Sequence, residues 1–202
     1  MRLFWTLSIV PRPDASFIGL MGITLATFLV FQDVPVALFG RDLTALQLAV
    51  AVFFFASTAR NLILNSRIWR DTTGKVGGAL AALLVPVVLI WIASVVAPIT
   101  LQMAFSAYML AYAAIVLAMV KWDAGNLHIV PSVWAKDPRF ATQTVTLVAV
   151  GDAVFAVTLA ALAFHASELA WIVMMTLGAV ATKFFVNWIN VLMVIGLLED
   201  DD

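Results

Sequence analysis

Six long apolar stretches, separated by short polar segments, constrain the fold of this 202-residue chain more than any other feature. An α-helix needs about 20 mostly apolar residues to cross the hydrocarbon core of a bilayer. The stretches that meet this requirement cover residues 16–39, 43–67, 76–96, 99–120, 140–164 and 167–198. The sequence therefore predicts an all-α polytopic membrane protein with six transmembrane helices, in which residues 1–202 form a single transmembrane domain.

The composition excludes several other classes of protein. The chain is 64% hydrophobic and 11% charged, whereas soluble domains are roughly 45–50% apolar and about 25% charged. Too few polar side chains are present to cover a soluble enzyme or to keep the chain disordered. The net charge of −1 supplies no field that would attract nucleic acid. Because the chain has no cysteine, disulfides, thiol catalysis and cysteine-ligated metals are also excluded.

The distribution of lysine and arginine predicts the orientation in the membrane. Cytoplasmic loops carry an excess of these residues. If the N-terminus is cytoplasmic, the outside loops hold Arg41 alone. The inside positions are then Arg2, Arg12, Arg67, Arg70, Lys75, Lys121, Lys136 and Arg139. Both termini are expected to be cytoplasmic, in a distribution typical of a bacterial inner membrane. The segment Leu3–Val10 is too short to cross and is expected to lie at the interface as a short helix.

Two spans have features that limit their geometry. Pro35 is expected to bend or end the first span near its far side. The sixth span has about 32 residues, more than a bilayer requires, so it is expected to tilt, break or project past the headgroups. Small residues such as Gly22 and Gly151 are expected to permit close approach between helices.

Three ionisable residues, Arg60, Asp152 and Lys183, fall within the spans. A charge at the bilayer centre costs at least about 2.5–3.5 kcal/mol on insertion scales, so such residues normally find partners in protein or water. At 1.5 Å per residue, Asp152 lies about 18 Å from the cytoplasmic start of its span, and Lys183 lies about 22 Å from the external end of the next. These similar depths predict an Asp152–Lys183 pair, although Arg60 could instead reach the headgroups.

Polar residues follow the charged ones along two spans. Helical spacing places Thr176, Lys183, Asn187 and Asn190 on a single face of the sixth span. In the second span, Asn61 and Asn65 stand four residues apart, beside Arg60. The predicted pathway or gate consists of Asp152, Lys183, Asn187, Asn190, Thr176, Arg60, Asn61 and Asn65. Two structural explanations remain open, because the amides and hydroxyls could simply join helices. The Asp152–Lys183 pair could likewise be a static clamp.

Two functions fit this pattern. The first is a channel or secondary transporter for an ion, proton or small polar solute, with the Asp152–Lys183 pair as its gate or coupling site. The second is a non-catalytic structural or assembly subunit of a larger membrane complex. The sequence lacks a zinc-protease motif, a phosphate-binding loop and a nucleophile elbow, and its ionisable residues are sparse. We therefore expect no enzyme, no metal and no cofactor, but a chain that is in contact with lipid and forms a homo-oligomer or binds other membrane subunits.

Overall fold

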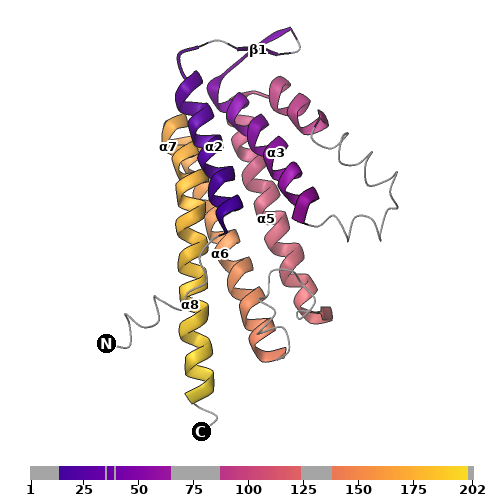
Figure 1. The fold of residues 1–202 in the computed structure, drawn as a ribbon, viewed down its shortest axis with the longest axis vertical. Coiled ribbons are helices and arrows are strands. Elements are labelled where there is room, and N and C mark those ends of the chain that lie inside the picture. The colour runs from indigo at the N-terminus through magenta and orange to yellow at the C-terminus, as the bar shows by residue number, and fades with distance from the viewer. Residues whose placement is uncertain (1–13, 35, 39, 65–86, 124–137, 200–202) are drawn as a thin grey trace. The chain divides into compact units, whose positions relative to one another are not determined.

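A computed structural model of the chain describes residues 14–34, 36–38, 40–64, 87–123 and 138–199 (Figure 1). The described residues are mostly helical, as the sequence predicts. Two predicted features, the interfacial segment at residues 3–10 and the pathway residue Asn65, lie outside them.

The elements follow one another as helices interrupted by one hairpin (Figure 1). A further helical segment covers residues 87–95, between α3 and α5. In chain order the named elements are α2 (Ala15–Phe31), β1 (Val36–Leu38), β2 (Arg41–Leu43), α3 (Ala45–Leu64), α5 (Pro98–Asp123), α6 (Pro138–His165), α7 (Glu168–Val173), the π-helix η2 (Met174–Gly178) and α8 (Ala179–Glu199).

Among the described residues, three helical stretches are long and apolar enough to cross a membrane. They cover Pro98–Ala118, Arg139–His165 and Glu168–Ile195, and they coincide with the last three predicted spans. Two further apolar helices, Ala15–Phe31 and Ala45–Arg60, are shorter. These lengths and compositions indicate a membrane protein. The count of six spans stays a prediction.

The predicted first span was wrong at its far end, because α2 ends at Phe31 and a two-stranded hairpin follows. Pro35 disfavours helical geometry at Val34, the residue before it. β1 pairs with β2 in antiparallel register, with Leu38 opposite Arg41. Gly40 stands in the turn with φ of 72°, a conformation that glycine adopts without strain. The apolar run therefore continues past the helix into a strand, which hydropathy alone does not distinguish from a longer helix.

The described residues pack as two compact units. The first, called here the hairpin unit, comprises the described residues of 14–101 and residues 166–176. Within it α2 packs along α3, and α7 also contacts α2. The core side chains of this unit are mainly large and aliphatic or aromatic, and include Leu20, Met21, Phe28, Leu46, Val50, Trp171 and Ile172.

The second unit, called here the α6–α8 unit, comprises residues 102–165 and 177–199 of the described chain. Its principal contact is between α6 and α8. Thr144 of α6 contacts Asn190 of α8, and Gly151, farther along α6, contacts Val186, which comes earlier in α8. The two helices are therefore antiparallel. The single transmembrane domain proposed for residues 1–202 stays a prediction.

Candidate functional site

α6 and α8 approach each other closely at Gly151. A Cβ atom added there would lie 2.5 Å from Cγ2 of Val186, well inside van der Waals contact. Only a hydrogen in place of a side chain lets Val186 occupy this position. The prediction that Gly151 permits close approach is thereby confirmed. At Gly22 no described side chain lies within 4 Å of the corresponding position, so the described part of the chain shows no such close approach there.

Asp152 and Lys183 flank this contact. Asp152 follows Gly151 directly on α6, and Lys183 lies three residues before Val186 on α8. The antiparallel register places the two residues, which carry opposite charges, at the same level of the helix pair. Asp152 is half-buried, whereas Lys183 is exposed at the edge of the contact.

A second polar cluster lies farther along the same pair of helices. The amide Nδ2 of Asn190 donates a hydrogen bond to Oγ1 of Thr144 at 2.8 Å. Nε2 of Gln143 approaches Oδ1 of Asn190 at 3.5 Å, at the long end of hydrogen-bonding distance. Asn190 is 2% exposed and Thr144 is 4% exposed, so this cluster is closed to its surroundings in the unit. Asn187 lies between the cluster and Lys183 and is half-buried.

Thr176 lies in the π-helix η2 and is fully buried. Its Oγ1 donates to the carbonyl oxygen of Ile172 at 2.7 Å, so its hydroxyl is satisfied within its own helix. A π-helical turn holds more residues than an α-helical turn. Extrapolating a uniform α-helical spacing from Thr176 to Lys183 therefore misplaces their relative phase. The long sixth span contains this widened turn, and the expectation that the span tilts, breaks or projects past the headgroups stays a prediction.

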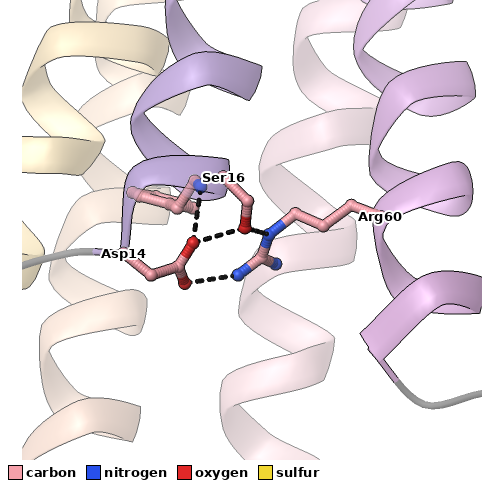
Figure 2. Close-up of polar contacts among 4 residues, drawn as sticks. Asp14, Ser16 and Arg60 are labelled. Carbon is pink, nitrogen blue, oxygen red and sulfur yellow. Dashed lines mark hydrogen bonds and ion pairs between the residues drawn. The ribbon is translucent and has the colours of Figure 1, made fainter.

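Arg60 contacts the N-terminus of α2 in the hairpin unit, as Figure 2 shows. Its Nη2 lies 2.7 Å from Oδ2 of Asp14, and its Nε donates to Oγ of Ser16 at 2.8 Å. The Ser16 hydroxyl in turn donates to Oδ1 of Asp14. The guanidinium carbon also stands 5.9 Å from the centre of the Phe17 ring, within range of a cation–π interaction. Through these contacts Arg60 links α3 to the N-terminus of α2.

Asp14 caps α2 and lies just before the first apolar span. Its Oδ1 accepts a hydrogen bond from the backbone N–H of Phe17 at 2.8 Å. The pKa of Asp14 is lowered to about 2, first by the hydrogen bond from Ser16 and also by Phe17 and Arg60, while partial burial opposes the shift. The carboxylate therefore stays ionised near neutral pH. The sequence did not predict this partner for Arg60, although Asp14 followed by a helix is a recognisable N-cap signal.

Two predicted pathway residues, Asn61 and Asn65, come at the end of α3 and just after it. Asn61 follows Arg60 on the backbone of α3, and Asn65 lies outside the described residues. Sequence reasoning also missed Gln47, which is 7% exposed and donates from Nε2 to the carbonyl oxygen of Val96 at 2.8 Å. The signal for Gln47 was available, since Thr44 and Gln47 have the spacing of a capping box.

The chemistry of these residues is that of charge and hydrogen bonding. Over the described ranges, no three histidine, cysteine, aspartate or glutamate residues gather closely enough to hold a metal ion. The α6–α8 contact offers a carboxylate, an ammonium group and a separate amide–hydroxyl cluster. Such groups can exchange protons, hold water or join helices. No protein-family model, curated protein or solved structure matches the chain.

Proposed function

We propose that this chain is an integral membrane channel or secondary transporter for an ion, proton or small polar solute, with Asp152 and Lys183 as its gate or coupling pair. The observation that supports the proposal is the register of α6 and α8, in which the Thr144–Asn190 and Gly151–Val186 contacts bring Asp152 and Lys183 to the same level. Ionisable groups at membrane depth are costly and usually mark ion or proton pathways. Asp152 and Lys183 lie on two of the helices that are long enough to cross.

The coupling step follows from the charge of Asp152. While its carboxylate is ionised, Lys183 has an opposite charge at the same level of the antiparallel pair. Protonation of Asp152 removes that attraction, and α6 and α8 are then free to shift at this level. Proton binding would thereby be linked to movement of the helices. Asn187 and the buried Asn190 continue the series of polar residues from Lys183 along α8 toward the cytoplasm.

The wider arrangement is part of the same proposal. Six spans would leave both termini in the cytoplasm, and the lysine and arginine distribution favours a bacterial inner membrane. Asp152, Lys183, Asn187 and Asn190 form the centre of the proposed pathway. Thr176, Arg60, Asn61 and Asn65 stay predictions as further pathway residues.

Flux through liposomes tests the proposal. Purified protein is reconstituted into vesicles that hold a pH-sensitive dye, and an imposed pH gradient and panels of monovalent ions serve as probes. We expect Asp152→Asn and Lys183→Ala to abolish flux while the protein stays folded and monodisperse. Thr158→Val is the matched control, since Thr158 lies on α6 and its hydroxyl donates within its own helix to Val154. Loss of folding in both charge variants, with no flux by the intact protein, would support a clamp instead.

A second candidate is a structural or assembly subunit of a larger membrane complex. The buried Asn190–Thr144 hydrogen bond favours it, because a closed interhelical contact of this kind joins helices without any transport. α6 also exposes an apolar stripe that includes Val150, Val154 and Val157. Purification in mild detergent should then return a stoichiometric partner chain. A homo-oligomer without any co-purifying chain would contradict this candidate.

A further inference from the structure

The helical stretch that contains α7, η2 and α8 changes its packing partner within η2. α7 contacts α2 of the hairpin unit, whereas α8 packs on α6. Thr176 is the last residue of this stretch in the hairpin unit, and Leu177 is the first in the α6–α8 unit. Among its described residues, the side chains that are at most 1% exposed all precede Leu177, namely Trp171, Ile172, Met175 and Thr176. α7 and the start of η2 are therefore more deeply packed than α8.

The backbone of η2 is suited to bending. Its i→i+5 hydrogen bonds make a wider turn than those of an α-helix, and helices kink at such π-turns. Oγ1 of Thr176 donates to the carbonyl oxygen of Ile172 at 2.7 Å and also approaches that of Val173 at 3.3 Å. A threonine hydroxyl that bonds back to the preceding turn favours bending as well. Gly178, the last residue of η2, has no side chain to restrict its backbone.

We propose that η2 is a hinge at which α8 pivots while α7 stays packed on α2. This inference deepens the proposed function and rests on it, because the pivot supplies the movement that protonation of Asp152 releases. The opposite charges of Asp152 and Lys183 favour the position of α8 in which Val186 lies against Gly151. Neutralisation of Asp152 removes that preference. A pivot at η2 then moves α8 without disturbing the buried side chain of Trp171.

Distances measured on either side of η2 test the hinge. Because the chain has no cysteine, introduced cysteines carry spin labels at the chosen positions only. Ile23 on α2, Leu169 on α7 and Met193 on α8 are all exposed. In lipid nanodiscs, we expect pulsed electron paramagnetic resonance to find one distance between labels at Ile23 and Leu169, and two between labels at Ile23 and Met193. A single distance for both pairs, in the wild-type background and with Asp152→Asn, would overturn the hinge.

Two changes within η2 show whether the movement arises there. A π-turn holds one residue more than an α-turn, so deletion of the exposed Leu177 lets η2 close into an α-turn without turning α8 about its axis. Thr176→Val keeps the side-chain volume and removes the hydroxyl that bonds to the preceding turn. Either change should leave the α2–α8 label pair with one distance. The control Thr158→Val, which removes a hydroxyl bonded within α6, should retain both distances.

Two distances that persist in the folded deletion variant, or in Thr176→Val if the deletion prevents folding, would overturn the hinge. Asp152→Asn separates the hinge from the proposed function, because asparagine resembles a neutral carboxyl group and should raise the fraction of the second distance several-fold. If the changes in η2 remove the second distance but Asp152→Asn leaves its fraction unchanged, the hinge stands and its coupling to Asp152 fails. Flux that depends on Asp152 in a protein with one distance would overturn the hinge and leave the proposed function standing.

Discussion

At the scale of single residues, the contact between Gly151 and Val186 sets how closely α6 and α8 approach. Packed interiors have little free volume, so an added methyl group must displace its neighbour. At Gly151 that neighbour is Cγ2 of Val186, at 2.5 Å from the added Cβ. At Gly22 and Gly19 the same addition meets no atom of the described residues within 4 Å. The three glycines therefore differ in how well they tolerate an added methyl group, although the sequence presents each as one small residue in an apolar run.

Gly151→Ala is expected to destabilise the folded protein by about 1–3 kcal/mol, the usual cost of overpacking a contact. Val186→Ala in the same chain should recover most of the loss, because it removes Cγ2 from the added methyl group. Gly22→Ala is the matched control and should change stability little. Thermal unfolding in detergent, followed by circular dichroism, measures all four proteins. Equal losses for Gly151→Ala and the double variant would contradict the contact.

The Asp14 carboxylate should give stability that depends on pH. Its pKa is lowered from 3.8 to about 2 in the folded chain, so its contribution is present above about pH 4 and is lost as the pH falls toward 2. Asp14→Asn keeps a capping side chain but removes the charge. Because Asp14 is about half exposed, the expected difference at neutral pH is only about 0–1 kcal/mol.

Unfolding midpoints of the wild-type protein and Asp14→Asn, compared from pH 7 to pH 2 in the same detergent, check this expectation. The two midpoints should converge as the pH falls below 4. A difference that stays constant over the whole range would show that the Asp14 charge does not contribute through Ser16, Phe17 and Arg60.

At the scale of elements, helix starts were predicted more accurately than helix ends. Pro98 and the cap at Ser167 stand within two residues of the predicted starts of the fourth and sixth spans, because proline and hydroxyl side chains fit the first turn of a helix. Pro35 was expected to bend or end the first span, but the hairpin after Phe31 was missed, because apolar residues continue through it. The π-helix η2 was missed as well, because an extra residue in one turn leaves hydropathy unchanged.

The candidate site was predictable in part for a similar reason. Their similar depths in two neighbouring spans were enough to predict that Asp152 and Lys183 lie at the same level. Which residues bond across the helices depends on rotation about each axis, and that rotation placed Asn190 against Thr144 and Val186 against Gly151. Asp14, the partner of Arg60, precedes α2 and lies outside the predicted spans. Comparing depths within the spans could therefore not pair the two residues.

The start of α3 gives a prediction at this scale. Thr44 and Gln47 form a reciprocal capping box, in which the N–H of Thr44 donates to Oε1 of Gln47 at 2.9 Å, and Gln47 also holds the Val96 carbonyl group. Gln47→Leu leaves those partners unsatisfied in a buried position and should cost about 1–3 kcal/mol. Thr58→Val is the control, because Thr58 bonds only within α3, to Phe54. Equal unfolding midpoints for the two variants would contradict the role of Gln47.

At the scale of the whole molecule, the number of crossings is the main prediction that remains to be tested. Six spans place the hairpin outside the cell and the C-terminus inside it. Since the chain has no cysteine, single-cysteine variants report topology without background labelling. We expect Asp42→Cys to react with an impermeant maleimide in intact cells, and Glu199→Cys to react only after permeabilisation. The same labelling of both variants in intact cells would contradict the six-span topology.

The most direct measurement of the proposed transport is proton flux through vesicles that contain equal amounts of folded Asp152→Glu, Asp152→Asn or wild-type protein. Glutamate keeps an ionisable carboxylate near Lys183, whereas asparagine keeps only the shape and polarity of the side chain. We expect the glutamate variant to retain part of the wild-type flux and the asparagine variant to show none. Equal flux through all three proteins would contradict a coupling role for the charge at Asp152.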